Sequence, residues 1–248
     1  MSMLSPRLVG VGGVDETSRY VRSFVNDTET NLLNMRSALA SVLRAHERQR
    51  AKGHKLANVL KVFAERETPN IKHALQCAAE GIVEVEISRK EMQDRVDAKC
   101  RDPLATYASI CDGVLDDLKV RELAIKKEQE KQVALDRVNM SQATNRTRIS
   151  QGQIELSGAS HEATTSSFAL TETVERFQVK KVNDVKSCLQ EYMYSQMQFH
   201  AKSLEIMTDL MALVNSTDFD ADVDEICDKI RPAAPKEVVG QRRGTLGR

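Results

Sequence analysis

The sequence predicts an all-α fold, an elongated antiparallel three-helix bundle of the coiled-coil type. Residues 159–231 contain neither glycine nor proline, and their apolar residues recur at steps of three and four, the period of a helix. A helix over 149–214 would be roughly 100 Å long at about 1.5 Å per residue, so it needs partner helices of similar length. Its apolar stripe consists of Leu170, Val174, Phe177, Val185, Leu189, Met193, Leu204, Met207, Met211 and Val214.

The composition is typical of long amphipathic helices. Trp is absent, and aromatic residues make up 4% and charged residues 29% of the 248 residues, which disfavours a large globular core. The formal net charge is zero, so no field of the whole protein favours nucleic acid, and we expect no nucleic-acid partner. Five single cysteines without a CxxC pair, no secretory signal pattern and no run of about 20 apolar residues predict a reduced, cytoplasmic protein.

The first predicted helix covers residues 15–65 and follows a flexible lead over residues 1–14. Its apolar residues, Leu39 and Val42 among them, alternate at three- and four-residue steps, as in a heptad seam. The seam turns polar ahead of Gly53, where a glycine suits either a bend or the close approach of a neighbouring helix.

The second predicted helix covers residues 68–138, with Thr68 as its N-cap ahead of a proline. Pro103 falls inside an apolar pattern that resumes at once. Because proline lacks an N–H and clashes with the preceding turn, it predicts a kink in this helix. The alternative is that Asp102 caps a separate helix.

A polar loop over residues 139–145 leads to the third predicted helix, over residues 149–214. The tail over residues 218–248 is acidic at first and basic from Lys229 onward. Two prolines and several glycines follow, so we expect the tail to be disordered.

The sequence contains no catalytic or metal-binding motif. A nucleophile elbow, a phosphate loop and a zinc signature are all absent, so we expect no enzymatic activity, no cofactor and no small-molecule substrate. None of the five histidines follows a glutamate by three residues, which excludes the paired Glu-x-x-His motifs of a di-iron bundle. The alternating aspartates from Asp218 resemble the start of a calcium loop. However, its glycine and glutamate positions hold Val223 and Lys229.

Two basic clusters are candidate sites for an anionic membrane. The first is a helical row of Arg44, Arg48, Lys52 and Lys55, to which Arg50 adds. The second flanks the loop between the second and third helices and consists of Lys126, Lys127, Lys131, Arg137, Arg146 and Arg148, with Lys119 and Arg121 nearby. Each Lys or Arg near an anionic leaflet contributes roughly 1 kcal/mol. The competing interpretation is a cytoskeletal coiled-coil adaptor on which both clusters are only solvated surface.

The apolar width of the third helix predicts a dimer. Residues such as Val182 and Met197 flank the main stripe, and a protomer of three thin helices has little interior in which to bury them. His46 and His200 also fall on seam positions, and we interpret both as core or interface residues. The predicted core and dimer seam includes Leu39, Val42, Phe177, Leu189, Met193, His200, Leu204 and Met207.

Several short motifs occur together in one order. They are Glu67-Thr68-Pro69, Pro103-Leu104-x-x-Tyr107, Asp116-Asp117-Leu118-Lys119, Ile149-Ser150-Gln151, Glu172-x-x-x-x-Phe177 and Phe199-His200-x-Lys202-x-Leu204-Glu205. In this order and spacing the sequence resembles the Chibby-interacting family of Bin/Amphiphysin/Rvs (BAR) domain proteins, formerly the FAM-ninety-two family. The likeness covers about residues 25–225.

The resemblance implies a crescent-shaped dimer of three-helix protomers, formed by two identical or two related chains. Such dimers bind and curve anionic phospholipid membranes through basic residues, as peripheral membrane proteins. By the same resemblance we expect a Chibby-like coiled-coil partner at the ciliary base, meaning the basal body, centriole and transition zone. There the family supports cilium assembly, and a mitochondrial association is also implied.

Overall fold

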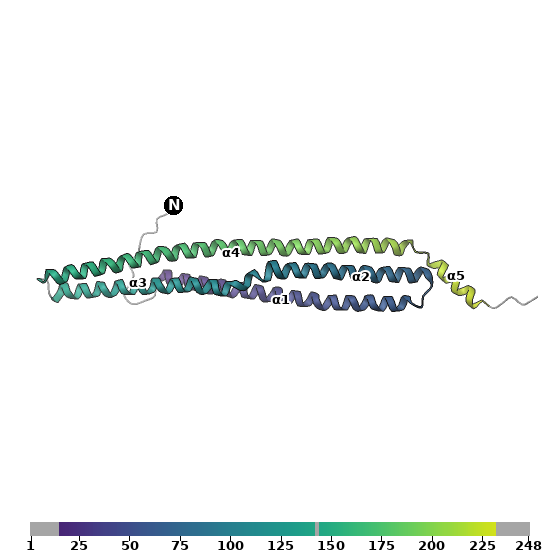
Figure 1. Ribbon diagram of the computed structural model, residues 1–248, viewed down its shortest axis with the longest axis horizontal. Helices are drawn as coiled ribbons and strands as arrows, with labels where there is room; N and C mark the ends of the chain where they lie inside the picture. The colour runs from purple at the N-terminus through teal and green to yellow at the C-terminus, as the bar shows by residue number, and fades with distance from the viewer. Residues whose placement is uncertain (1–14, 142–143, 232–248) are drawn as a thin grey trace, which may run out of the picture. The chain divides into compact units, whose positions relative to one another are not determined.

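The computed structural model describes residues 15–141 and 144–231, and these are almost entirely helical (Figure 1). The elements are α1 (Glu16–Ala64), α2 (Pro69–Val96), a π-helical turn (Asp97–Arg101), a 3₁₀ turn (Pro103–Thr106), α3 (Tyr107–Ser141), α4 (Arg146–Ser216) and α5 (Phe219–Ile230). No strand occurs in these two ranges, so the predicted all-α class is confirmed. The flexible lead expected over residues 1–14 lies outside the described part.

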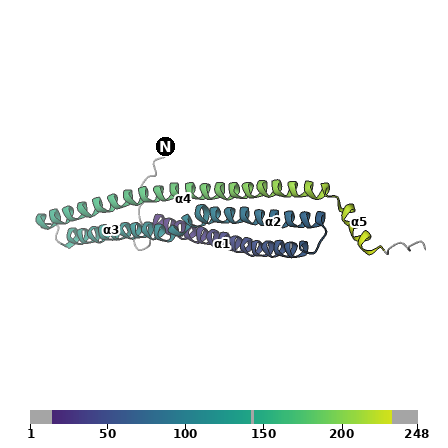
Figure 2. The same cartoon turned by 45° about the vertical axis from the view of Figure 1, so that its right-hand side comes forward.

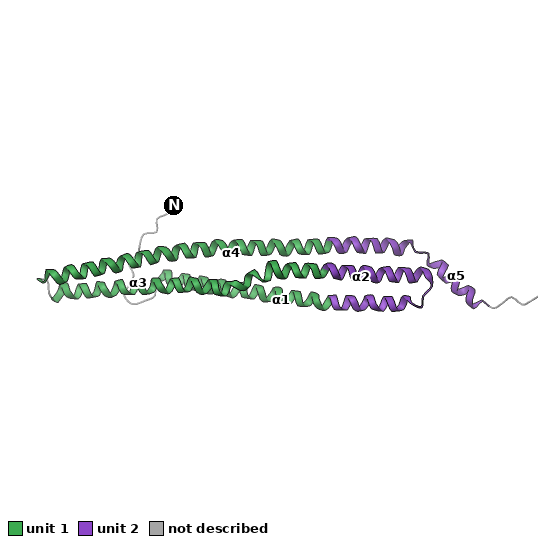
Figure 3. Ribbon diagram, viewed as in Figure 1, with its two compact units in different colours: residues 1–49, 89–200 green, residues 50–88, 201–248 purple. Residues whose placement is uncertain are grey.

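The chain divides into two compact units (Figure 3). The first comprises Met1–Gln49 and Arg89–His200, and the second comprises Arg50–Ser88 and Ala201–Arg248. None of the described helices is long and apolar enough to cross a membrane.

In the first unit, α4 runs antiparallel to α3, because Lys127 pairs with Glu162 whereas Lys131, further along α3, pairs with Glu155, earlier on α4. In the same way, Leu43 and His46 of α1 contact Gln93 and Arg89 of α2 in reverse order. An ion pair of 2.9 Å joins Arg22 on α1 to Glu122 on α3. Between α3 and α4, which lie side by side in both views (Figure 1, Figure 2), Lys131 pairs with Glu155 at 2.8 Å. The three antiparallel helices of this unit agree with the predicted bundle.

The core of the first unit surrounds Phe177 on α4. The ring of Phe24 meets it edge-on at 5.8 Å between centroids, and the ring of Tyr107 meets it at 6.4 Å. Tyr107 is fully buried, and its hydroxyl donates a hydrogen bond of 2.8 Å to Asp184. The only polar atom of this large side chain is therefore satisfied inside the core.

The predicted second helix is interrupted between α2 and α3. The N–H of Asp102 donates to the carbonyl of Asp97 at 3.0 Å, a π-type bond, and a 3₁₀ turn follows from Pro103. Asp102 has helical torsions and its side chain makes no capping bond, so the alternative of an Asp102-capped separate helix is wrong. The side chain of Cys100 is fully buried and its thiol donates to the carbonyl of Cys188 at 3.3 Å. That Pro103 sets the path of the helix stays a prediction.

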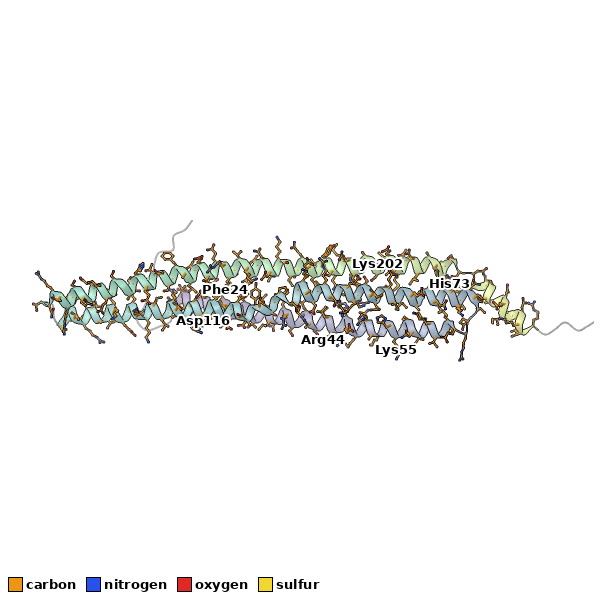
Figure 4. The ribbon with its side chains drawn as sticks, in the orientation of Figure 1. Phe24, Arg44, Lys55, His73, Asp116 and Lys202 are labelled. Carbon is orange, nitrogen blue, oxygen red and sulfur yellow. The ribbon has the colours of Figure 1, made fainter. Side chains whose placement is uncertain are left out.

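The second unit packs α1, α2 and α4 closely. A Cβ built on Gly53 would lie 2.5 Å from the Glu86 carboxylate, so a glycine leaves room for this buried side chain. Between α2 and α4, the ammonium of Lys202 (labelled in Figure 4) lies 3.3 Å from the carboxylates of both Glu84 and Glu205. Gly53, which was predicted to permit the close approach of a neighbouring helix, therefore makes room for the Glu86 side chain of α2.

Helix α5 corrects one prediction. The acidic segment that begins the tail was expected to be disordered, but Phe219–Ile230 is a helix. Asp218 caps it by accepting a hydrogen bond of 3.1 Å from the N–H of Ala221, and acidic residues in the first turn suit the positive end of the helix dipole. The run of aspartates is thus a helix start rather than a solvated tail. The basic remainder, residues 232–248, lies outside the described part.

Candidate functional site

The first basic cluster lies on the outer side of α1. The helix buries Ala57 and Ala64, and the spacing of four, four and three residues places the basic side chains on another side. Figure 4 labels two of them, Arg44 and Lys55. All four members of the row Arg44, Arg48, Lys52 and Lys55 are exposed, and none has a carboxylate within ion-pair distance among the described residues. We call these four residues the α1 basic row.

Arg50 differs from the α1 basic row. Its side chain is half-buried, whereas the four members of the row are exposed, and it has an interaction partner within the protein. We therefore leave Arg50 out of the row, although the sequence pattern grouped it with the others.

The second basic cluster is partly neutralised by the fold. The ammonium of Lys127 lies 2.6 Å from the carboxylate of Glu162, and that of Lys131 lies 2.8 Å from Glu155. This contact and a hydrogen bond from Gln151 lower the pKa of Glu155. A carboxylate beside a lysine cancels much of the field that would attract an anionic lipid.

The other members of this cluster have mixed surroundings. Lys126 lies 3.9 Å from Glu130, and Arg148 also has a partner. Arg137 and Arg146 are exposed beside the α3–α4 loop, and the described residues supply no carboxylate within ion-pair distance of either. This cluster therefore offers fewer unpaired charges than the sequence suggested.

Arg121, in the same basic stretch, does not belong to the surface. Its guanidinium is buried and contacts Asp15 at 2.7 Å, Ser18 at 3.1 Å and Ser167 at 3.2 Å. Burial alone would raise the pKa of Asp15, but hydrogen bonds from Arg121 and Ser18 outweigh it, so this pKa lies below its usual value. The network joins the start of α1 to α3 and α4.

The predicted core and dimer seam separates into two groups. Phe177 is buried, and Leu39 packs against the same core. The other members are exposed in the protomer, with values of 46% for Leu189 and 69% for Leu204. These exposed members are not core residues of the protomer, and their place in a dimer seam stays a prediction; they are Val42, Leu189, Met193, His200, Leu204 and Met207.

The buried side of α4 is displaced from the predicted stripe. Beyond Phe177 the helix buries Cys188, Ser195, Phe199 and Ile206, which recur at steps of four and seven. Leu189 follows the buried Cys188 by one residue, a rotation of about 100° around the helix. The guanidinium of Arg89 lies 4.7 Å from the centre of the Phe199 ring and covers it, while His200 points outward.

Helix α4 is thus apolar on two sides. One side packs within the protomer, and the other, about 120° away around the helix, is exposed. We call the exposed side the α4 outer stripe; it consists of Val182, Leu189, Met193, Leu204, Met207, Met211 and Val214. An exposed apolar stripe of this kind is a candidate interaction site, because water does not favour it.

The arrangement of helices defines the class of this protein. It is similar to the amphiphysin BAR domain from Drosophila, with a TM-score of 0.59 and 14% identity over 90% of this chain and 100% of that chain. It is also similar to the Imp2 F-BAR domain, with a TM-score of 0.57 and 13% identity over 87% of this chain and 84% of that chain. At these identities the likeness shows the fold, which is that of a BAR domain.

The sequence comparisons place the chain within that class. The model of the FAM92 protein family matches residues 7–224, and the chain belongs to this family. CBY1-interacting BAR domain-containing protein 1 of Mus musculus is 30% identical over 85% of this chain and 73% of its own length. The Danio rerio protein of the same name is 28% identical over 88% of this chain and 74% of its own length. The resemblance drawn from the sequence motifs is confirmed.

Proposed function

We propose that this chain is a non-enzymatic scaffold that dimerises and uses the α1 basic row to bind and curve anionic membranes. The observation that carries the proposal is the state of that row: four exposed cations for which residues 15–141 and 144–231 supply no carboxylate partner, on a protein with a BAR fold. Each contributes roughly 1 kcal/mol near an anionic leaflet, and a dimer displays two rows. The second cluster contributes less, because three of its lysines have carboxylates nearby.

Dimerisation is supported by the α4 outer stripe. Its residues are between 41% and 69% exposed in the protomer. A second helix that packed on the stripe would remove this apolar surface from water. Burial of a large apolar side chain stabilises an interface by about 1.5–3 kcal/mol. The partner is a second copy or a related chain.

The names of the relatives extend the proposal to the cell. Those proteins are called CBY1-interacting. We therefore propose that this chain acts with a Chibby-like coiled-coil protein as a peripheral membrane protein of the cytoplasm, at the basal body, centriole and transition zone, in cilium assembly. An association with mitochondria is a further proposed location.

Co-sedimentation with phosphatidylserine vesicles tests the membrane proposal. Arg44→Glu/Arg48→Glu should weaken vesicle binding by at least about tenfold, because it reverses four charges in the dimer. The matched control, Lys127→Glu/Lys131→Glu, reverses as many charges at residues that already have carboxylate partners and should lose less. If the Arg44/Arg48 variant binds like the parent, the row is only solvated surface. A cytoskeletal coiled-coil adaptor without lipid contact then becomes the better interpretation.

A further inference from the structure

Helix α5 is held to α2 through one buried residue. Asp222 is the only residue of α5 that is buried. The large apolar side chains of the helix are between 37% and 74% exposed; they are Phe219, Val223, Ile226 and Ile230. The docking of α5 therefore depends on the polar contacts of a single carboxylate and not on apolar burial. An element held in this way opens at low free-energy cost.

The carboxylate of Asp222 occupies the N-terminal end of α2. It accepts hydrogen bonds from the backbone N–H of Asn70 at 3.2 Å and of Ile71 at 2.6 Å. The side-chain amide of Asn70 donates to it at 3.0 Å, and the Thr68 hydroxyl also donates to it. The first N–H groups of a helix lack partners within the helix and favour an anion, so α5 fills an anion site on α2. Figures 1 and 2 show α5 following α4 near this end of α2.

These contacts hold the Asp222 carboxylate in its charged form. Burial alone would raise the pKa of Asp222, but hydrogen bonds from Ile71, Thr68 and Asn70 outweigh it, so this pKa lies below its usual value. The site thus holds one negative charge, and a second anion placed beside the carboxylate is repelled by it. A group that adds negative charge at this point therefore competes with Asp222 for the end of α2.

Thr68 is placed to acquire such a charge. It lies between the end of α1 and the start of α2, it is half-buried, and Arg66 and Pro69 beside it are exposed. Its hydroxyl contacts Asp222 directly, so it becomes free when α5 opens. Pro69 holds Thr68 in an extended backbone conformation, and a threonine followed by proline is the acceptor that proline-directed protein kinases use.

We propose that Thr68 is a phosphorylation site for a proline-directed protein kinase and that its phosphate releases α5 from α2. In the reaction the Thr68 oxygen bonds to the γ-phosphorus of ATP, the bond between that phosphorus and ADP breaks, and a base of the kinase takes the hydroxyl proton. The product carries a charge of roughly −1.5 to −2 at pH 7, with three acceptor oxygens where a donor hydroxyl stood.

The phosphate displaces Asp222 for two reasons. It repels the carboxylate, and it takes away the hydrogen bond that the Thr68 hydroxyl donates. Because it is attached at the residue before α2, it also accepts from the N–H groups at the start of that helix, where a phosphate is favourable. Helix α2 thus keeps an anion at its end while α5 loses its one buried contact. Since α4 ends at Ser216 and α5 begins at Phe219, α5 can leave without a change in α4.

Phosphorylation of the full chain followed by hydrogen exchange tests the proposal. The only other hydroxyl residue before a proline is Ser5, so Ser5→Ala leaves Thr68 as the single acceptor of this kind. This chain is treated with ATP and a cyclin-dependent or a mitogen-activated protein kinase. Mass spectrometry should find one phosphate, on Thr68, and hydrogen exchange in α5 should rise at least about tenfold while α1 and α4 keep their protection. Absence of phosphate on Thr68, or parental exchange in α5 after phosphorylation, overturns the proposal.

Substitutions in α5 identify the contact that the phosphate breaks. Asp222→Ala should raise hydrogen exchange in α5 without a kinase. The matched control Asp220→Ala removes an exposed acid from the same first turn and should leave exchange at the parental value. Phosphorylation of the Asp222→Ala chain should then add no further increase. A further increase as large as that without the substitution shows that the phosphate does not act through Asp222, and the proposal fails.

Substitutions of Thr68 separate the added charge from the lost hydrogen bond. Thr68→Val removes the hydroxyl without adding charge, so Asn70 and Ile71 should still hold Asp222, with exchange in α5 close to the parental value. Thr68→Glu adds an anion at the same point and should raise this exchange clearly above that of the valine variant. Equal exchange in the two variants contradicts displacement by charge. These outcomes are independent of dimerisation and of vesicle binding, which the proposed function concerns.

Discussion

A buried arginine shows how a single residue can reverse the meaning of a sequence pattern. Arg121 falls in a basic stretch, yet its guanidinium contacts Asp15, Ser18 and Ser167 inside the first unit. Sequence spacing placed its charge at the surface, because Ser18 and Ser167 lie 103 and 46 residues away and no local pattern points to any of the three partners. The distant contact, and not the local charge density, decides what this residue does.

The Arg121 network predicts a pH-dependent stability. Arg121→Met should leave the Asp15 carboxylate without its partner and destabilise the fold by about 3 kcal/mol at neutral pH. Because the folded-state pKa of Asp15 is lowered, its contribution is complete above the unfolded value of about 3.9 and is lost as pH falls through the folded pKa. Thermal melts from pH 7 to pH 2 should show the parent and variant converging in acid. A gap that stays constant over this range would contradict the assignment.

The cysteines differ in reactivity for a reason that spacing does not reveal. Burial, with a contribution from Cys188, raises the pKa of Cys100 to about 12, and burial raises that of Cys111 to about 11. Cys227 is exposed on α5. The thiolate is the nucleophile, so iodoacetamide at pH 8 should label Cys227 first and should reach Cys100 and Cys111 only after unfolding. Mass spectrometry of digested samples reads this order; rapid native labelling of Cys100 would contradict it.

At the scale of the element, helices were predictable where one periodic pattern dominates. The ends of α1 and α4 lie within three residues of the predicted boundaries, because a long seam and flanking breakers fix them. The interruption between α2 and α3 was expected only as a kink at Pro103. Its π turn begins at Asp97, where no breaker stands, and the burial of Cys100 against α4 is a contact that periodicity cannot supply.

The two apolar sides of α4 explain why the sequence did not show which side packs within the protomer. Both sides have a helical period, and the more continuous stripe in the sequence is the exposed one, whereas the buried side includes Cys188 and Ser195. Sequence reasoning therefore found the candidate dimer surface while interpreting it also as the protomer core. Which of two equally periodic stripes packs within the protomer depends on the shapes of the neighbouring helices.

A pair of substitutions separates the two sides of α4. Phe177→Asp places a carboxylate in the core of the first unit and should unfold it, at a cost of several kcal/mol. Leu189→Asp places the same charge on the α4 outer stripe, so the protomer should keep its helical spectrum while its dimer dissociates. Circular dichroism and sedimentation equilibrium read the two properties independently. Equal melting curves for both variants would refute the assignment of sides.

At the scale of the whole molecule, charge is balanced but locally separated. The sequence has 36 basic and 36 acidic residues, so the proposed membrane binding depends on a local surface, the α1 basic row, and not on the net charge. The α4 outer stripe supplies the opposite chemistry, an apolar surface without net charge. The two proposed contacts therefore respond differently to salt, since screening weakens charge contacts between exposed groups and spares apolar burial.

This difference gives a test of the full assembly. Raising salt from about 50 mM to about 500 mM shortens the screening length from roughly 14 Å to roughly 4 Å, so binding to phosphatidylserine vesicles should fall steeply. Dimerisation through the α4 outer stripe should persist over the same range in sedimentation experiments. Leu189→Asp/Met193→Asp should bind vesicles more weakly at low salt although its basic row is intact, because a monomer presents one row where the dimer presents two. Parental vesicle binding by this monomeric variant would show that a single protomer is the membrane-binding unit, and the dimer would then need a different role.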